Sequence, residues 1–136
     1  HSGRCGERFL RTMGNIVVAE DNIVMQKLLT KRLQMAGHEV RMASNGVEAL
    51  ALLEAAVADL ILSDIAMPQM DGLTLLRRVR SDVRVIGVPF GLLTTSVLDQ
   101  HRLEARQGGA DGYLQKPVSS WELDTMINNL LTREKS

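Results

Sequence analysis

Short apolar runs alternate with segments of helical periodicity along this chain, and the alternation limits the possible folds more than any other feature. The apolar runs are predicted to be strands at 16–19, 39–43, 59–63, 87–94 and 111–115. The segments that follow them carry apolar residues three and four positions apart and are predicted to be helices at 25–36, 46–56, 73–80, 98–107 and 121–132. Strands and helices that alternate over short connections predict an α/β fold, with one parallel sheet and helices on both faces.

Local signals predict where these helices end and which face they bury. Gly37 is expected to end the first helix, and Asp71 is expected to cap the third. The inward face of the second helix is predicted to consist of Val47, Leu50, Leu53 and Val57. The fourth helix, 98–107, has few and poorly spaced apolar residues. We therefore expect it to be weakly anchored, which suits a moving part.

Length, charge and cysteine content exclude several classes of protein. A chain of 136 residues can bury one core as a single domain. Lysine plus arginine equals aspartate plus glutamate, 16 each, so no overall charge favours nucleic acid or an anionic membrane. The single cysteine, Cys5, cannot form an internal disulfide, which fits a reducing compartment and predicts a cytoplasmic location. No apolar stretch approaches the ~18 residues that span a bilayer.

The chain is predicted to have one folded domain and one short tail. Residues 1–14 are interpreted as an N-terminal tail or the remnant of a linker, and 15–134 as the domain. The first residues are His-Ser rather than Met, which favours a piece of a longer protein whose neighbouring domains are missing.

Side chains able to bind a metal or a phosphoryl group follow several of the predicted strands. Glu20 and Asp21 follow the first, Asp64 the third, Thr94 ends the fourth and Lys116 follows the fifth. The carboxyl ends of parallel strands meet at one edge of the sheet, so we expect these side chains to lie together. Clustered carboxylates repel one another unless a hard cation such as Mg²⁺ binds them. A lysine and a hydroxyl opposite the cation could hold a phosphoryl group, and an aspartate facing it can act as a nucleophile.

These residues lie in longer motifs that resemble the receiver domain of two-component response regulators. The motifs are Val18-Ala19-Glu20-Asp21-Asn22, Asp64-Ile65-Ala66-Met67-Pro68-Gln69-Met70-Asp71-Gly72, Leu93-Thr94-Thr95 and Gly109-Ala110-Asp111-Gly112-Tyr113-Leu114-Gln115-Lys116-Pro117. One motif alone is moderately specific, whereas all of them in this order are highly specific. The resemblance covers 15–133 and implies a single (βα)5 domain of the flavodoxin-like or CheY-like type, with 15–134 as the receiver domain.

The resemblance implies a role for each residue that would meet the phosphoryl group. Asp64 is the implied phosphoryl acceptor, and Thr94 and Lys116 are each expected to bind a phosphoryl oxygen. Tyr113 matches the switch aromatic, which moves inward when Thr94 is drawn toward the phosphate. The peptide bond between Lys116 and Pro117 is expected to be cis, which proline permits at modest cost.

The resemblance also implies a metal site. Mg²⁺, or Mn²⁺ in its place, is expected on Glu20, Asp21, Asp64 and the backbone carbonyl of Ala66, with Asp21 as a direct ligand and Glu20 acting through water. Two positions depart from the commonest pattern of the family. Glu20 replaces an aspartate, and Thr95 stands where a small alanine is usual. Both leave the lifetime of the phosphoryl group open.

The implied function is a signalling switch rather than a turnover enzyme. A histidine kinase or a histidine phosphotransfer protein is the expected donor, and the domain is expected to catalyse its own phosphorylation and slow dephosphorylation. Phosphorylation should bias an existing equilibrium and reshape the face built by 98–132, with a phosphorylation-dependent homodimer as a further expectation. We expect the domain itself to bind neither nucleic acid nor membrane.

Two other functions were compared with this one. A phosphatase of the haloacid dehalogenase type needs a second carboxylate two residues after the nucleophile, and Ala66 occupies that position. A degenerate receiver-like interaction module that never takes phosphate remains the alternative, although such a module would normally have lost one of the site residues. Other polar residues are given structural roles: His38 and His101 are expected on the surface, and Asp71, Asp82 and Asp111 at caps and turns.

Overall fold

A computed structural model describes residues 13–132, in which strands and helices alternate throughout. The strands are β1 (Asn15–Ala19), β2 (Glu39–Ala43), β3 (Leu60–Asp64), β4 (Phe90–Thr94) and β5 (Gly112–Gln115). The helices are α2 (Ile23–Met35), α3 (Gly46–Ala55), α4 (Gly72–Arg80), α5 (Asp99–Gln107) and α6 (Ser120–Thr132). The order of elements is as predicted. Cys5, most of the predicted tail and positions 133–134 of the predicted domain lie outside the described residues.

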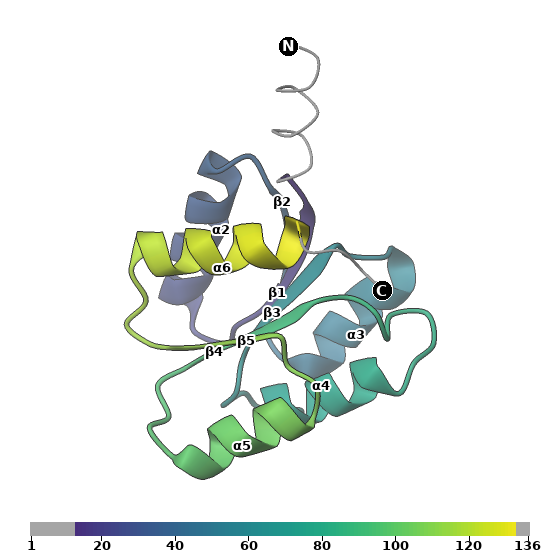
Figure 1. Cartoon of the computed structure of the whole chain (residues 1–136). Coiled ribbons are helices and arrows are strands. Elements are labelled where there is room, and N and C mark those ends of the chain that lie inside the picture. The colour runs from purple at the N-terminus through teal and green to yellow at the C-terminus, as the bar shows by residue number, and fades with distance from the viewer. Residues whose placement is uncertain (1–12, 133–136) are drawn as a thin grey trace.

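The strands form one parallel sheet in the order β2-β1-β3-β4-β5 (Figure 1). A helix follows each strand, and the helices α2 to α5 return the chain to the start of the next strand. The carboxyl ends of the strands therefore lie along one edge of the sheet, where open α/β sheets bind their ligands. The α/β fold predicted from the sequence is confirmed.

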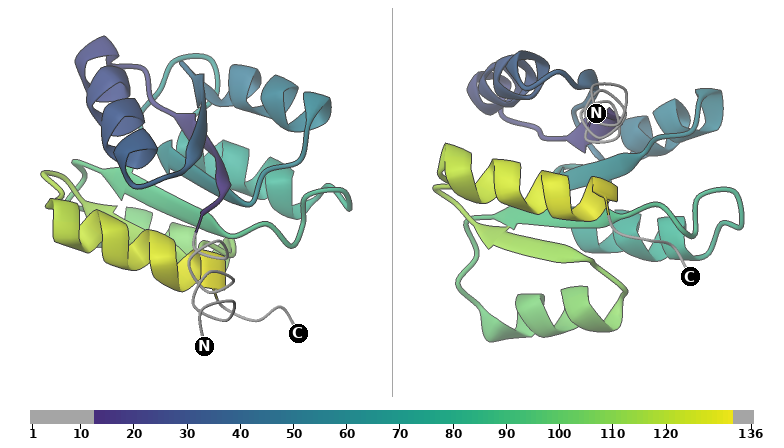
Figure 2. Two further views of the ribbon diagram at one scale, coloured as in Figure 1. Left: turned by 90° about the horizontal axis from the view of Figure 1, so that it is seen from above. Right: turned by 45° about the horizontal axis from the view of Figure 1, so that its top comes forward.

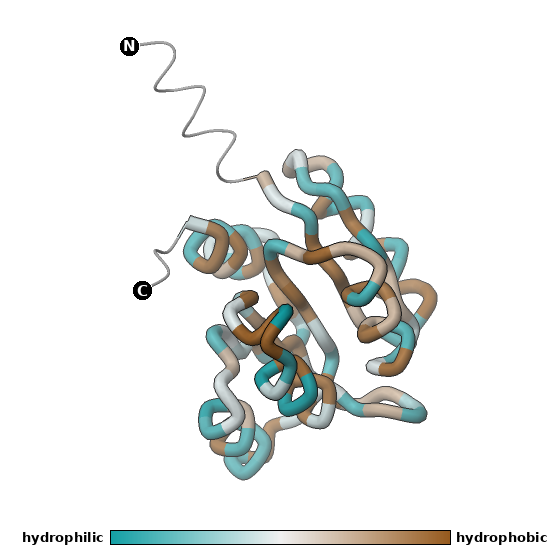
Figure 3. The backbone as a smooth tube through the Cα atoms, turned by 90° about the vertical axis from the view of Figure 1, so that its right-hand side faces the viewer, coloured by the Kyte–Doolittle hydropathy of each residue, from teal (hydrophilic) through white to brown (hydrophobic). Residues whose placement is uncertain are grey.

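Two layers of helices cover the sheet, with α2 and α6 on one face and α3, α4 and α5 on the other (Figure 2). Alternate residues of the inner strands contribute to two separate cores. Ile16 and Val18 of β1 pack toward α2 and α6, whereas Val17 and Ala19 pack toward the opposite layer. The strands are apolar on both faces because both faces are covered, and Figure 3 shows them as brown stretches inside the molecule.

The inward face of α3 differs from the prediction. Leu53 is buried and Leu50 is partly buried as expected, but Val47 is 47% exposed and Val57 is 66% exposed. Ala49, which the prediction left out, is completely buried. The helix is thus rotated so that Ala49 and Leu53, four positions apart, face the core, whereas Val47 faces outward. Val57 lies beyond the end of the helix, so the helical spacing of apolar residues does not predict which way its side chain faces.

Strand β4 is shorter than predicted and begins at Phe90 rather than at position 87. The residues before it form turns that are held from α4, because Arg80 donates to the carbonyl oxygens of Ile86 at 3.0 Å and Val88 at 2.8 Å. Asp111 pairs with Arg80 at 2.8 Å and accepts a hydrogen bond from the N–H of Phe90 at 2.9 Å. Asp111 therefore has the structural role that the sequence predicted.

Helix α5 is weakly anchored, as predicted. Ala105 is its only buried residue, and its N-cap residue Leu98 makes no side-chain hydrogen bond to the helix. By contrast, Asp71 caps α4 by accepting a hydrogen bond from the N–H of Thr74 at 2.8 Å. Among the described helices, none is long and apolar enough to span a bilayer.

The prediction that His38 lies on the surface is wrong. The side chain is 7% exposed, and its Nδ1 accepts a hydrogen bond from the N–H of Gly14 at 3.1 Å. This bond connects the segment that enters β1 to the turn between α2 and β2. The bond needs a ring nitrogen without a proton, so only neutral His38 can accept it. Burial lowers the pKa of His38, while the charge of Asp124 acts in the opposite direction.

Acid is therefore expected to destabilise the domain through His38. Its folded-state pKa lies below the unfolded value of about 6.5, so its stabilising effect is complete above that pH and is lost as the pH falls through the folded-state pKa. His38→Asn keeps an acceptor near the position of Nδ1 but cannot be protonated. Urea unfolding between pH 5 and pH 7.5 should show a shallower loss of stability in this variant. Equal slopes for the two proteins would contradict the role assigned to His38.

Candidate functional site

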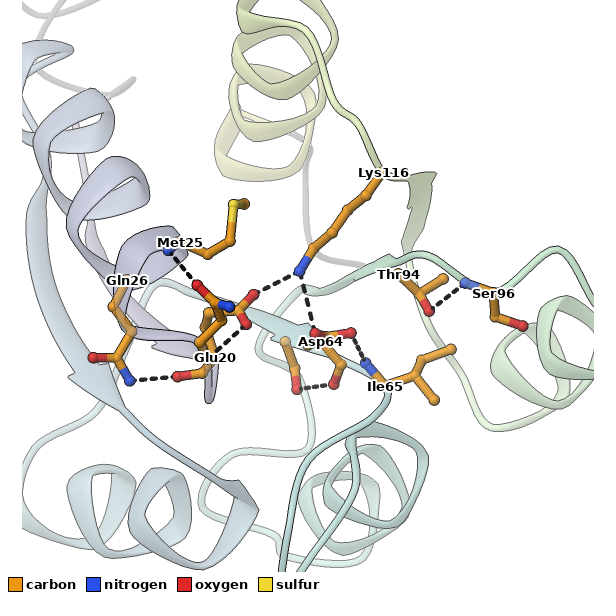
Figure 4. A network of polar contacts seen from close by, with 10 residues as sticks. Glu20, Met25, Gln26, Asp64, Ile65, Thr94, Ser96 and Lys116 are labelled. Carbon is orange, nitrogen blue, oxygen red and sulfur yellow. Dashed lines mark hydrogen bonds and ion pairs between the residues drawn. The ribbon is translucent and has the colours of Figure 1, made fainter.

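The four sequence motifs meet at the carboxyl edge of the sheet (Figure 4). Glu20 follows β1, Asp64 is the last residue of β3 and Thr94 is the last residue of β4. Lys116 follows β5 at the edge of the sheet, and its side chain extends back toward the middle strands. The strand order places β1 directly beside β3, so two of the predicted carboxylate positions are neighbours across one strand pair.

Lys116 joins two of the carboxylates. Its Nζ lies 2.6 Å from Oε1 of Glu20 and 3.2 Å from Oδ2 of Asp64. Burial acts to lower the pKa of Lys116, but the hydrogen bonds and negative charges of Glu20 and Asp64 outweigh it, so the pKa lies above its usual value. The ammonium group is therefore charged at neutral pH and already bound to two carboxylates at this edge.

Asp64 is held in place by its own loop. Its Oδ1 accepts the N–H of Ile65 at 2.7 Å, and its carbonyl oxygen accepts the hydroxyl of Ser63 at 2.7 Å. The N–H of Gly72, the first residue of α4, donates to the carbonyl of Ile65 at 2.8 Å and brings the helix against the end of β3. The Asp64 side chain remains partly exposed and lies beside Lys116.

Glu20 is fixed more tightly than a surface carboxylate. It is 2% exposed, and its Oε2 accepts the N–H of Asn22 at 3.1 Å. The amide of Gln26 donates to the backbone carbonyl of Glu20 from the first turns of α2. The sequence did not identify Gln26 as part of the site, because its contact depends on how α2 folds back over the end of β1.

The acidic cluster fits a divalent cation. Glu20, Asp21 and Asp64 each place one carboxylate oxygen within 4.8 Å of the others. Within the described residues, Lys116 is the one cation that forms ion pairs with this cluster. Three negative charges therefore face a single positive charge, and oxygen ligands are those that Mg²⁺ prefers. Ala66 lies exposed in the loop after β3, and the role of its carbonyl stays a prediction.

The structure does not join the predicted switch residues to the acceptor. Thr94 is 2% exposed, and its Oγ1 accepts the N–H of Ser96 at 3.0 Å rather than contacting Asp64 (Figure 4). Tyr113 packs against the core beneath α5, with the guanidinium carbon of Arg102 4.6 Å from its ring centroid. Burial raises the pKa of Tyr113, and its hydroxyl has no hydrogen-bond partner among the described residues. The Lys116–Pro117 peptide bond is cis, as the resemblance implied.

An apolar cavity of about 970 Å³ opens beside the carboxylates. One wall is the start of α2 and the other is the segment from Lys116 to Val118. Ile23 and Val24 on the α2 wall are 65% and 74% exposed. Thr95, one of the two unusual residues, also lines it. The sequence offered a signal for this surface, since adjacent apolar residues at the start of α2 cannot all face the core.

Comparison with known proteins agrees with this geometry. The family model for the response regulator receiver domain matches residues 16–128. The chemotaxis protein CheY4 of Vibrio cholerae is 32% identical with a TM-score of 0.82, and the match covers 87% of this chain and 98% of that one. The receiver domain of sensor histidine kinase PA1611 from Pseudomonas aeruginosa has a TM-score of 0.82 at 29% identity, over 88% of this chain and 98% of that one. That structure has a magnesium ion coordinated in its active-site cleft.

Curated relatives are longer proteins. The DNA-binding dual master transcriptional regulator RpaA of Synechocystis is 33% identical over 121 residues, which are 89% of this chain and 50% of the relative. The chain thus spans about half the length of the curated transcriptional regulators that it matches.

Proposed function

This chain belongs to the response regulator receiver family, and on that basis we propose that it accepts a phosphoryl group on Asp64 from a phosphohistidine. The donor is a histidine kinase or a histidine phosphotransfer protein. The observation that carries the proposal is the Asp64 carboxylate, which is accessible, lies 3.2 Å from the Lys116 ammonium and shares a cluster with Glu20 and Asp21.

The proposed transfer is a displacement at phosphorus. A carboxylate oxygen of Asp64 forms the new P–O bond while the P–N bond of the phosphohistidine breaks, and the imidazole leaves with the electron pair and takes up a proton. Lys116 binds a phosphoryl oxygen and neutralises charge as the group arrives. Phosphoryl transfer depends chiefly on such positioning and charge neutralisation. The hydrogen bond from the N–H of Ile65 keeps the Asp64 side chain directed at the donor.

Glu20, Asp21 and Asp64, with the carbonyl of Ala66, are the proposed residues for Mg²⁺ or Mn²⁺. The metal supplies positive charge that offsets the repulsion between the carboxylates and an incoming phosphoryl group. The excess of negative charge in the cluster supports this part of the proposal.

The apolar cavity supports a protein as the phosphoryl donor. A protein that delivers a phosphoryl group to Asp64 must cover the surface around it, and this surface includes Ile23 and Val24 of α2. Burying such exposed apolar side chains contributes about 25 cal/mol per Å² before the cost of association is subtracted. The partner proposed here therefore presents an apolar surface around its phosphohistidine.

The proposed output is a change in conformation rather than a product released in turnover. Phosphorylation draws the Thr94 hydroxyl to a phosphoryl oxygen and biases the positions of α5 and Tyr113. The weak anchoring of α5 supports this, because few contacts oppose its movement. A degenerate module that never takes phosphate is the less favoured function, since Glu20, Asp21, Asp64 and Lys116 are all present and clustered.

Covalent labelling with a small phosphodonor such as acetyl phosphate tests the proposed function. The protein should be labelled in Mg²⁺, and removal of the metal with EDTA should slow labelling by about a hundredfold or more, since a metal ion supplies several kcal/mol of charge stabilisation. Labelling is followed by intact-protein mass spectrometry, and excess Mg²⁺ should restore it. Absence of a label under all conditions, or labelling at an equal rate in EDTA, would contradict the proposal.

A further inference from the structure

A series of polar contacts leads from Thr94 to the first turn of α5. Oγ1 of Thr94 accepts the N–H of Ser96 at 3.0 Å. The Ser96 hydroxyl in turn lies 2.6 Å from Nδ1 of His101 and accepts the N–H of Leu98 at 3.2 Å. Ser96 and His101 lie outside the four sequence motifs, and the proposed function gives neither of them a role.

These contacts provide the polar attachment of an otherwise loosely held helix. The N-cap position of α5, Leu98, offers no side-chain acceptor, and the helix buries one residue. Ser96 supplies an acceptor for the N–H of the N-cap residue Leu98, one of the donors at the start of α5 that has no partner within the helix. Because its oxygen accepts from Leu98, its single hydroxyl proton can be donated to Nδ1 of His101.

We propose that Ser96 and His101 are positioning residues that keep the Thr94 hydroxyl in its resting position, away from Asp64. The inference rests on the proposed function, in which Thr94 moves to bind a phosphoryl oxygen. If Thr94 moves, it either breaks the bond to the Ser96 N–H or carries Ser96 with it, and the bond to His101 joins Ser96 to the first turn of α5. The movement of Thr94 therefore costs that hydrogen bond or displaces the start of α5.

Removing the contact between Ser96 and His101 should make the movement of Thr94 easier. It should also uncouple that movement from the position of α5. Ser96→Ala and His101→Ala are each expected to bind beryllofluoride with Mg²⁺, a phosphoryl mimic, about 2- to 10-fold more tightly, the range that one hydrogen bond supplies. When beryllofluoride binds, hydrogen exchange of the α5 amides should change less in these two variants than in the wild type. The double variant should bind no more tightly than the single variants, because both remove the same bond.

Two further variants distinguish positioning from general loosening of the loop. Val97→Ala removes a side chain that is 73% exposed in the same loop and should bind beryllofluoride like the wild type. Ser96→Thr keeps the hydroxyl and should also retain wild-type affinity. Equal affinity in Ser96→Ala, His101→Ala and the wild type would overturn the inference, as would weaker binding by the two alanine variants.

Failure of the proposed function gives a different result. A wild type that does not bind beryllofluoride contradicts the function itself, and the contact is then judged in the ligand-free protein. In the ligand-free protein, Ser96→Ala should accelerate hydrogen exchange of the amides at 98–102, because it removes the acceptor of the Leu98 N–H and the contact with His101. Unchanged exchange would overturn the inference whatever the behaviour of the mimic.

Discussion

Asp64→Asn is expected to take no covalent label from acetyl phosphate under conditions in which the wild type is labelled in Mg²⁺. The neutral amide lacks the nucleophilic carboxylate oxygen, yet its own oxygen can still accept the N–H of Ile65. The substitution therefore removes the proposed chemistry and keeps the local hydrogen bond. Intact-protein mass spectrometry measures the loss directly.

A second carboxylate nearby provides the matched control. Asp71 caps α4 from the same loop, and asparagine is an equally good N-cap residue. Asp71→Asn should therefore fold and be labelled like the wild type. A label that persisted in Asp64→Asn, or that was lost equally in Asp71→Asn, would contradict the assignment of the acceptor.

Thermal unfolding shows whether the loss of label comes from unfolding. Asp64→Asn should unfold at the same temperature as the wild type or above it, because it removes one of three clustered negative charges. Lys116 keeps Glu20 as a partner at 2.6 Å, so the ammonium is not left without a negative charge. If Asp64→Asn unfolded at a temperature well below that of the wild type, the missing label would no longer report on the nucleophile. Asp64→Ala would then be labelled in place of Asp64→Asn.

Gly72→Ala is expected to destabilise the domain by about 3 kcal/mol or more, at the upper end of the range for overpacked sites. A Cβ atom on Gly72 would lie 2.0 Å from the carbonyl oxygen of Asp64 and 3.0 Å from Cα of Ile65. Both neighbours are backbone, so no side chain can turn aside to relieve the clash. Relief requires separation of α4 from the end of β3, which displaces the acceptor. Urea unfolding measures the free-energy change, and labelling by acetyl phosphate should fall as well.

Gly87→Ala is the matched control for this substitution. A Cβ atom at Gly87 would meet nothing within 4 Å, and the residue is exposed. Its stability should stay within about 0.5 kcal/mol of the wild type, as for most surface substitutions. Equal effects at the two glycines would show that added chain stiffness, rather than the clash with Asp64, determines the outcome.

The fold and the positions of the main site residues could be predicted because each follows from a local rule. Short apolar strands alternating with helices require a parallel sheet, and a parallel sheet gathers residues such as Glu20, Asp64 and Lys116 at one edge. Asp71 was predictable for a similar reason, since a cap depends on residues within one turn of it.

Features that depend on packing between distant segments could not be predicted in the same way. The burial of His38 results from the approach of Gly14, 24 positions earlier in the chain. The exposure of Val47 and the burial of Ala49 depend on how α3 is rotated against the sheet. The contact between Ser96 and His101 requires a loop and a helix turn to meet in one geometry. None of these has a signature in the spacing of apolar residues.

Because the ion pair between Lys116 and Glu20 joins the two ends of the sheet-forming sequence, we expect the site to be completed late in folding. The two residues are 96 positions apart, and Lys116 reaches the cluster only after β5 has joined β4 at the edge of the sheet. Contacts between such distant segments form slowly, because the chain must first close a long loop. A nascent or partly unfolded chain therefore carries a cluster of acidic residues without its lysine. Under the proposed function, phosphoryl transfer to Asp64 would therefore depend on completion of the whole domain.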